Sequence, residues 1–410
     1  MAVIRPFRAV RPPTAKAQEV ASVPYDVVNT AEARALAAHN PLSFLHVSRA
    51  EIDLPDGTDV HSDAVYRKAL ENYENLTKSC PLETEVEPSI YLYRLIMNGR
   101  AQIGVVACCS LDEYDNDLIK KHERTRRDKE DDRTHHMLVL RAQTGPVFLT
   151  YRSLPDIDAL VQEAVSRDPL FDFAAADDIR HTVWRVSDPK RFVNAFRAAP
   201  ALYIADGHHR AASASRARAE LRDHSFAHLG DEEYNYFLTV IFPDNQLQIL
   251  PYNRAVRDLD GMSQAQFLAQ VAEQFAVSEN APAAPAERGR WSMYLDGKWY
   301  GLSLKESGAA KSAAGPVSSL DVSMLQDRLL DPILGIKDVR TDKRIDFIGG
   351  IRGTAELERL VTQGLAQVAF SLFPTTIEDL LTVSDAAEIM PPKSTWFEPK
   401  LRDGLLIHAI

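Results

Sequence analysis

The sequence predicts an α+β fold with mixed sheets, because hairpins and helices follow one another without a regular order. Three hairpins are indicated by apolar or β-branched runs on both sides of a short turn, at Asn98-Gly99, Pro243-Asp-Asn245 and Asp296-Gly297. Helical segments lie between them, and no regular strand–helix–strand alternation is visible. We therefore expect sheets with packed helices rather than a doubly wound parallel sheet.

The chain begins with about 30 proline-rich residues that follow no regular pattern. A helix is predicted over 31–39, because Asn40-Pro41 ends it. A strand is predicted over 43–47, and apolar residues at helical spacing predict a longer helix over 60–77.

The three hairpins supply most of the predicted strands. Their strand pairs are 89–97 with 102–110, 236–242 with 247–252, and 291–295 with 298–304. Exposed loops are predicted over 281–287 and 306–316, where alanine, proline, glycine and serine predominate.

The last part of the chain is expected to form an α/β region. A helix is predicted over 321–330, ending before Pro332, and is followed by a helix over 354–362 and a strand over 367–372. Because 410 residues are many for one domain, we expect two, over 1–255 and 256–410.

Composition excludes several classes of function. The net charge of -11 argues against nucleic acid as the main partner. The three cysteines have no metal-binding or disulfide spacing, and Cys108-Cys109 lies in an apolar run typical of a reduced core. No apolar segment is long enough to cross a membrane, and the N-terminus lacks a signal-peptide pattern, so we expect a cytoplasmic protein. Its expected partner is a small-molecule substrate, and a homodimer is a further expectation.

Polar residues gather at one predicted strand-to-helix turn. The apolar run 201–205 predicts a buried strand, and alanine-rich sequence after it predicts a helix. A helix N-terminus offers unpaired N–H groups and partial positive charge, glycine allows close approach, and arginine suits phosphate oxygens. The predicted phosphate-binding residues are Asp206, Gly207, His208, His209 and Arg210.

Two other interpretations of this turn are open. In the first, Asp206 caps the helix and the two histidines are solvated. In the second, Asp206, His208 and His209 hold a metal ion, although adjacent histidines on a helix point in different directions.

A second charged group runs from Lys120 to His136. One interpretation is a solvated helix with ion pairs three or four residues apart. The other is a phosphoryl-transfer site, which needs cations for phosphates, carboxylates for Mg²⁺ and a base for the acceptor hydroxyl. In the second interpretation Glu123, between His122 and Arg124, is the candidate base.

The same stretch offers the other groups that such a site requires. Asp131 and Asp132 are the candidate ligands of Mg²⁺, which prefers carboxylate oxygens. Lys129 and Arg133 are candidates for contacting phosphate, as is Arg124.

A third group lies near the C-terminus, in the proline-fixed loop 391–400. Lys393, Ser394 and Thr395 are candidates for facing phosphate, and the alternative is a loop that packs its aromatic residues on the core. Supporting or substrate-binding roles are expected for Tyr25, Asp26, Asn253, Arg254 and the glycine-containing segment 341–350.

Over nearly its full length the chain resembles a bacterial and archaeal family known as domain of unknown function 1015. The matching segments are Arg5–Arg8, Pro24–Val27, His122–Thr125, Lys129–Arg133, Asp206–Arg210, Tyr252–Arg254, Thr341–Asp346 and Pro392–Phe397. The run Asp206-Gly-His-His-Arg210 also resembles the phosphate-binding turn of ParB/sulfiredoxin-like proteins, among which free-serine kinases carry the same five residues.

The resemblance implies a ParB/sulfiredoxin-like catalytic core within 1–255 and a Mg²⁺-dependent kinase that converts free L-serine to O-phosphoserine. The implied donor is ATP or ADP, with pyrophosphate as an alternative. The turn would hold the donor phosphates and Glu123 would accept the hydroxyl proton. Arg124, Lys129 and Arg133 would neutralise the transferred group, and His122, Asp206 and His208 complete the expected catalytic set.

Two other functions are open. The first is a regulatory switch that binds and hydrolyses nucleotide, as ParB-like proteins do. The second is a hydrolase with a metal held by His122, His135 or His136 together with Asp131 or Asp132.

Overall fold

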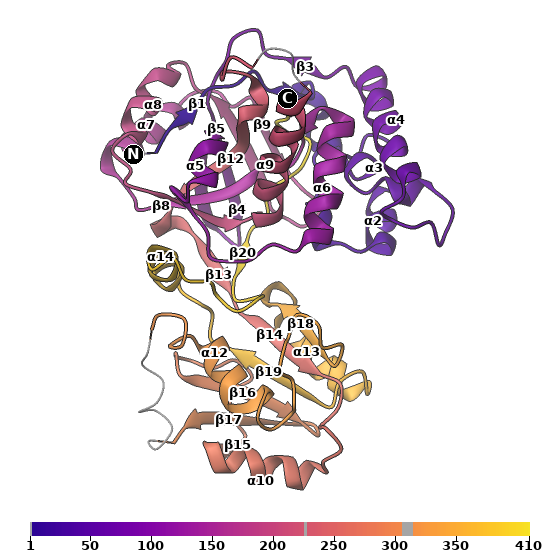
Figure 1. Cartoon of the computed structure of the whole chain (residues 1–410), viewed down its shortest axis with the longest axis vertical. Coiled ribbons are helices and arrows are strands. Elements are labelled where there is room, and N and C mark those ends of the chain that lie inside the picture. The colour runs from indigo at the N-terminus through magenta and orange to yellow at the C-terminus, as the bar shows by residue number, and fades with distance from the viewer. Residues whose placement is uncertain (1, 225–227, 306–314) are drawn as a thin grey trace. The chain divides into compact units, whose positions relative to one another are not determined.

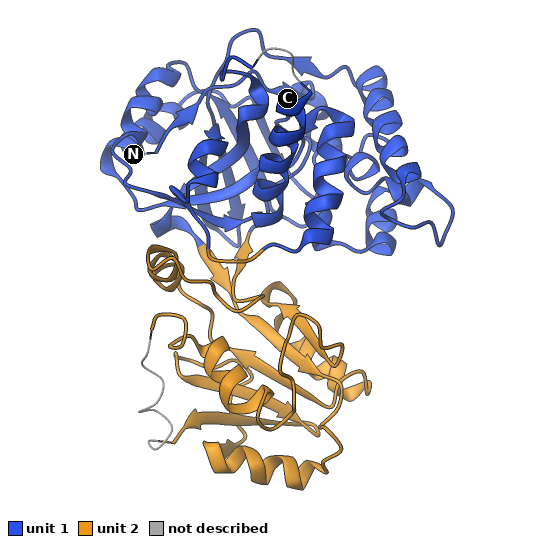
Figure 2. Cartoon of the chain, in the orientation of Figure 1, with its two compact units in different colours: residues 1–121, 125–247, 399–410 blue, residues 122–124, 248–398 orange. Residues whose placement is uncertain are grey.

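The computed structural model describes residues 2–224, 228–305 and 315–410. Within them the chain forms two compact units (Figure 2). Unit 1 comprises 1–121, 125–247 and 399–410, and unit 2 comprises 122–124 and 248–398. The sequence predicts a division at 255/256, whereas the units divide at 247/248 and residues 399–410 belong to unit 1.

Unit 1 is built on a nine-stranded mixed sheet with the order β6-β11-β8-β12-β5-β4-β10-β9, with β1 added to β5. Two neighbouring pairs, β11 with β6 and β12 with β8, are parallel, and the other pairs are antiparallel. In sheet order the strands are β6 Ile119–Lys120, β11 Leu202–Asp206, β8 Val147–Tyr151, β12 Tyr236–Pro243, β5 Arg100–Ser110, β4 Tyr91–Met97, β10 Arg180–Arg185 and β9 Phe171–Ala174, with β1 at Ile4–Arg5.

Helices pack against this sheet (Figure 1). Helix α9 contributes a face of small residues, including Ala211, Ala214 and Ala217, to the main core, which allows close packing on the strands. Helix α6 runs beside α9, and Ser213 Oγ donates a hydrogen bond to the Glu130 carbonyl over 3.1 Å. The helices of unit 1 are α1 Ala17–Val20, α2 Thr30–Ala37, α3 Leu45–Ser48, α4 Asp63–Ser79, α5 Leu111–Asp115, α6 Arg127–Leu140, α7 Pro155–Val165, α8 Pro189–Phe196 and α9 His208–Asp223.

The C-terminal residues are part of unit 1. Strand β21 (His408–Ala409) pairs with β7 (Ala142–Gln143), and Asp403 forms a backbone bridge with Ser22. These pairings place the last residues of the chain beside β7 and Ser22, which lie far away in the sequence.

Unit 2 contains a six-stranded antiparallel sheet with the order β15-β17-β16-β19-β14-β18. Its strands are β14 Tyr252–Val256, β15 Phe275–Glu279, β16 Arg290–Leu295, β17 Lys298–Leu304, β18 Ile345–Gly349 and β19 Val368–Leu372. A separate ribbon pairs β13 (Gln248–Leu250) with β20 (Trp396–Glu398). The helices are α10 Gln264–Gln274, α12 Asp321–Leu325, α13 Gly353–Thr362 and α14 Ile377–Asp385, with a π-helical turn, η6, at Gln326–Leu330.

The mixed sheets with interspersed helices confirm the predicted α+β class. Two hairpins are confirmed, β4–β5 and β16–β17, and the cysteines 108 and 109 are buried and free. The helices over 31–39, 60–77 and 354–362 are confirmed within two or three residues at their ends. The loop predicted over 306–316 lies mostly outside the described residues.

Two local predictions are wrong. The segment 43–47 is not a strand but leads into helix α3, and the Ser43 carbonyl accepts a hydrogen bond from the His46 N–H over 3.1 Å. Strand β12 does not form a hairpin with the segment after it, because both of its edges are occupied by β5 and β8. The following strand, β13, pairs with β20 instead. Among the described helices, none is long and apolar enough to span a membrane.

Candidate anion-binding site

The turn between β11 and α9 is the centre of the candidate site. Gly207 sits between the strand and the helix with φ 95°, a conformation that favours glycine. A Cβ at this position would lie 3.0 Å from Nε of Arg210, so a side chain here would also crowd the guanidinium. Gly207 is the N-cap residue, and no side chain caps α9. The interpretation of Asp206 as the cap is therefore wrong.

Arg210 lies in the first turn of α9 and is 5% exposed. Its Nη1 donates a hydrogen bond to the Pro146 carbonyl, and its Nη2 lies 3.7 Å from Oδ2 of Asp206. Within the described part of the chain, the buried Nε of Arg210 has no hydrogen-bond partner. One donor of a buried guanidinium, beside an uncapped helix start, is thus available to an anion.

Acidic groups around Arg210 keep it charged. Burial opposes ionisation, but the carboxylates of Asp26, Asp206 and Asp403 raise the pKa of Arg210. Asp206 also pairs with Lys400, whose Nζ lies 3.2 Å from Oδ2. Although burial opposes it, the cations Lys400 and Arg210 hold the pKa of Asp206 well below its ordinary value.

Asp403 is the unusual acid of this group. It is 3% exposed, its Oδ1 has no hydrogen-bond partner among the described residues, and it packs on Gly145 so closely that a Cβ there would lie 2.5 Å from Oδ1. Burial, helped by the nearby charge of Asp26, raises the pKa of Asp403 to about 7 against the pull of Arg210. Asp403 is therefore a buried carboxyl group that titrates near neutral pH.

Lys400 and Asp403 were missed by sequence reasoning. Both come from the C-terminal segment, which the pairing of β21 with β7 carries back to unit 1. The only sequence signal is that charged residues interrupt an apolar tail, as in Pro399-Lys-Leu-Arg-Asp403.

Tyr25 and Asp26 lie beside the same group, as members of a short 3-10 turn. The guanidinium of Arg133 lies 4.1 Å from the ring centre of Tyr25, and burial together with Asp26 raises the pKa of the Tyr25 hydroxyl. The sequence predicts only a supporting role for Tyr25 and Asp26, and the structure places Tyr25 against Arg133, a predicted phosphate-contacting residue.

The two histidines of the turn face different neighbours. His208 is buried, and Nε2 of His209 accepts a hydrogen bond from the Arg126 N–H over 3.0 Å. A ring nitrogen that accepts a hydrogen bond is neutral, with the proton on the other nitrogen. His209 thus ties the start of α9 to the segment before α6.

The candidate magnesium ligands Asp131 and Asp132 are separated by the geometry of α6. Asp131 is exposed and pairs with Arg216 over 2.5 Å. Asp132 is buried, pairs with Arg133 over 2.8 Å and accepts a hydrogen bond from the Tyr66 hydroxyl over 2.9 Å. Adjacent residues on a helix face different directions, so the pair does not fit one ion.

The two α6 histidines proposed for a hydrolytic metal face different surroundings. Nε2 of His136 lies 3.1 Å from the Val47 carbonyl, and burial lowers the pKa of His136 to about 3. His135 is exposed and packs on the Tyr66 ring. His122 belongs to unit 2.

The stretch from Lys120 to His136 is not one solvated helix. It contains the end of β6, an irregular segment and then α6, which begins at Arg127. Lys129 lines a small polar cavity with Asp132, Arg133 and His136. Charged residues of the stretch from Lys120 to His136 form ion pairs, such as Arg126 with Asp128 and Glu130 with Arg216 of α9.

In unit 2 the structure joins two groups that the sequence analysis treated separately. His122 Nε2 lies 3.5 Å from Oγ1 of Thr395, and the His122 carbonyl accepts a hydrogen bond from the Met390 N–H over 2.8 Å. Glu123 and Arg124 follow in the same segment, half-buried and exposed respectively.

The loop that carries Thr395 is fixed by its own hydrogen bonds. Ser394 Oγ donates to the Pro391 carbonyl over 2.6 Å, and Arg254 Nη2 donates to the Lys393 carbonyl over 3.0 Å. Lys393 is exposed, with Nζ 5.6 Å from the ring centre of Tyr252. Ser394 thus serves the loop geometry, Lys393 is exposed, and the half-buried Thr395 directs its hydroxyl to His122.

Comparison with protein families matches residues 4–323 to a model described as a protein of unknown function, DUF1015. The chain belongs to the DUF1015 family. No curated protein matches this DUF1015 chain.

Several solved structures match the chain at low identity. One is a free serine kinase variant in complex with AMP, with 14% identity, 72% of this chain and 87% of that chain covered, and a TM-score of 0.35. Another is a conserved hypothetical protein from Pyrococcus furiosus, with 15% identity, 73% and 94% covered, and a TM-score of 0.35. A third is SbnI with a C-terminal truncation from Staphylococcus aureus, with 11% identity, 72% and 82% covered, and a TM-score of 0.38. At these scores the ParB/sulfiredoxin-like core stays a prediction.

Proposed function

We propose that this DUF1015 protein is a small-molecule kinase that transfers a phosphoryl group from a nucleotide, or from pyrophosphate, to free L-serine. The observation that carries the proposal is Arg210, which is buried at the uncapped start of α9 with its Nε free of hydrogen bonds to described residues. A phosphate is bound well where backbone N–H groups, the positive end of a helix dipole and an arginine guanidinium meet, as they do here.

The supporting residues suit a phosphate turn. Gly207 keeps the approach to the backbone open, and Lys400 adds a second cation that pairs with Asp206.

In the proposed reaction the serine hydroxyl oxygen forms a bond to the transferred phosphorus. The bond between that phosphorus and the bridging oxygen of the donor breaks, and the hydroxyl proton passes to a base. The resemblance to serine kinases assigns the base to Glu123. The contact between His122 and Thr395 supports a role for this segment, because it orders the residue next to the base.

The residues Asp131 and Asp132 do not fit a magnesium ion as a pair, since one is exposed and the other is buried against Arg133 and Tyr66. The requirement for Mg²⁺ and the cytoplasmic location stay predictions.

The decisive experiment is phosphorus NMR on the full chain with Mg²⁺, L-serine and, in turn, ATP, ADP and pyrophosphate. We expect a phosphoserine resonance with the wild type and its loss with Arg210→Gln. Arg222→Ala, an exposed arginine at the other end of α9, is the matched control and should keep full turnover.

The same experiment separates the alternatives. Donor consumed at an equal rate without serine would indicate a nucleotide-hydrolysing switch and overturn the kinase. Turnover retained in a folded Arg210→Gln variant would remove the phosphate assignment from this turn. Glu123→Gln should bind the donor normally but lose turnover, and normal turnover would place the base elsewhere.

A further inference from the structure

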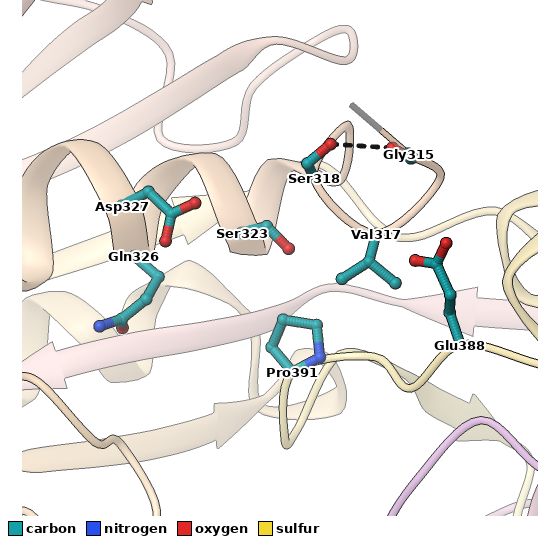
Figure 3. A pocket seen from close by; sticks show the side chains of 8 residues that line it. All are labelled: Gly315, Val317, Ser318, Ser323, Gln326, Asp327, Glu388 and Pro391. Atoms are coloured by element: carbon teal, nitrogen blue, oxygen red, sulfur yellow. Dashed lines mark hydrogen bonds between the residues drawn. The ribbon is translucent and has the colours of Figure 1, made fainter. Parts of the chain in front are cut away.

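A second cavity lies within unit 2, and none of the residues of the proposed phosphate turn line it. It has a volume of about 360 Å³ and is bounded by the turn 315–318, the start of η6 and the segment before Pro391 (Figure 3). This volume matches the lower end of small-molecule sites, which start at roughly 300 Å³.

Two residues that line this cavity each carry a buried side-chain oxygen without a hydrogen-bond partner among the described residues. Ser323 is 5% exposed, and its Oγ has no hydrogen bond to any residue that the structure describes. The same holds for Oε1 of Gln326, whose Nε2 donates to the Ile336 carbonyl over 2.7 Å. That bond fixes the amide, so its oxygen is left to another donor. Buried polar atoms are normally satisfied, and two that share one cavity point to a ligand.

The charges of the cavity have one sign. Asp327 is exposed and Glu388 is half-buried, and neither has an ion-pair partner in the described ranges. The lining residues include no lysine, arginine or histidine. Figure 3 shows the carboxylates of Asp327 and Glu388 on opposite sides of Ser323. A ligand that brings hydrogen-bond donors and positive charge is complementary to this lining.

The same residues do not favour a bare metal ion. Within the described residues, no third carboxylate, histidine or cysteine joins Asp327 and Glu388 at metal-binding distances. Val317 and Pro391 add apolar walls, which suit carbon atoms and not the water shell of an ion.

The backbone at the cavity is also unusual. The Asp331 N–H donates to the Gln326 carbonyl over 3.0 Å, a bond of the π type that begins η6. π-helical turns interrupt regular helices and are frequent at functional sites. Here the turn sets the positions of Gln326 and Asp327 at the edge of the cavity.

We propose that this cavity binds a small aliphatic molecule with a primary ammonium group. An ammonium group has three donors, and the acceptors that face it here are Ser323 Oγ and the carboxylates of Asp327 and Glu388, which lie on either side of Ser323. The carbon chain lies against Val317 and Pro391. The proposal does not depend on the kinase function, since it uses other residues and another ligand chemistry.

Calorimetric titration of the full chain with n-butylamine tests the proposal, with 1-butanol and butyrate as probes of equal length without the cation. We expect saturable binding of the amine and at least about tenfold weaker binding of the alcohol and the acid. Glu388→Gln should weaken amine binding about tenfold, because it replaces a charge-assisted hydrogen bond by a neutral one. Glu273→Gln, an exposed change on α10 of the same unit, is the control and should leave the affinity unchanged.

Two variants of Ser323 locate the ligand. Ser323→Ala removes one acceptor without adding volume and should weaken the amine several-fold. Ser323→Leu fills the cavity and should abolish binding, with thermal unfolding as the check on its fold. Equal binding of butylamine and butanol would overturn the ammonium site, as would amine binding that Ser323→Ala and Glu388→Gln both leave unchanged.

Discussion

Two regions of unit 1 carry dense charge, helix α6 and the start of α9, and they differ in how that charge is neutralised. On α6 the charges pair locally, as Asp132 does with Arg133 and as Asp131 does with Arg216 of the neighbouring helix. At α9, Arg210 keeps a buried Nε without a hydrogen bond to described residues. A site for an anion therefore depends on which donors remain available and not on the number of charges.

The largest expected effect tests this difference directly. Arg210→Gln should weaken ADP binding about 100-fold, because it removes charge-assisted hydrogen bonds in a buried setting. Arg216→Gln, on the same helix, should change ADP binding less than about twofold, since Arg216 serves Glu130 and Asp131. Calorimetric titration measures both. Similar losses in the two variants would show that overall positive charge, rather than the turn, attracts the nucleotide.

The second prediction concerns two buried acids with opposite shifts. Burial raises the pKa of Asp403 to about 7, whereas Arg133 and the Tyr66 hydroxyl hold the pKa of Asp132 below its ordinary value despite burial. Because the pKa of Asp403 is raised in the folded state, the folded protein binds more protons than the unfolded chain between about pH 4 and 7. The contribution of Asp403 to the free energy of unfolding therefore falls as the pH rises through this range. A lowered pKa gives stability above about pH 4 that is lost on acidification.

Urea unfolding at several pH values checks these signs. Relative to Asp403→Asn, the wild type should lose about 2 kcal/mol between pH 5 and 7. Relative to Asp132→Asn, the wild type should keep its advantage over this range and lose it below about pH 4. Asp223→Asn, an exposed change at the end of α9, is the control. Parallel pH profiles for the wild type and Asp403→Asn would mean that Asp403 does not titrate near neutrality.

The comparison also separates what the sequence predicts from what it leaves out. The turn at α9 is predictable because all of its polar residues are contiguous, as is the β4–β5 hairpin, whose turn needs only Asn98 and Gly99 with positive φ. The pairing of β12 cannot be predicted from local sequence, because its partners β5 and β8 lie about 90 to 130 residues earlier in the chain. Local turn signals carry no information on which edge of a sheet is free.

The site follows the same rule. Lys400 and Asp403 reach the turn only through strand pairing at the C-terminus, and no spacing rule connects them to Asp206. Conversely, Asp131 and Asp132 are adjacent in the sequence and still face different surroundings, because helix geometry rotates neighbours apart. Closeness in the sequence thus wrongly suggests that Asp131 and Asp132 act together, and it gives no sign that Lys400 lies beside Asp206.

The smallest expected effect isolates the contact between the turn and its arginine. Gly207→Ala forces a non-glycine residue to φ 95° and places a Cβ 3.0 Å from Arg210 Nε. Gly230→Ala is a matched control, because its φ is 94° and nothing lies within 4 Å of its added Cβ. Both variants should lose roughly 1 kcal/mol from backbone strain, measured by urea unfolding. Only Gly207→Ala should also weaken ADP binding, by several-fold, because the new methyl group displaces the guanidinium that the proposed phosphate contacts. If both variants bind ADP equally well, Arg210 has room to move and the glycine serves the turn alone.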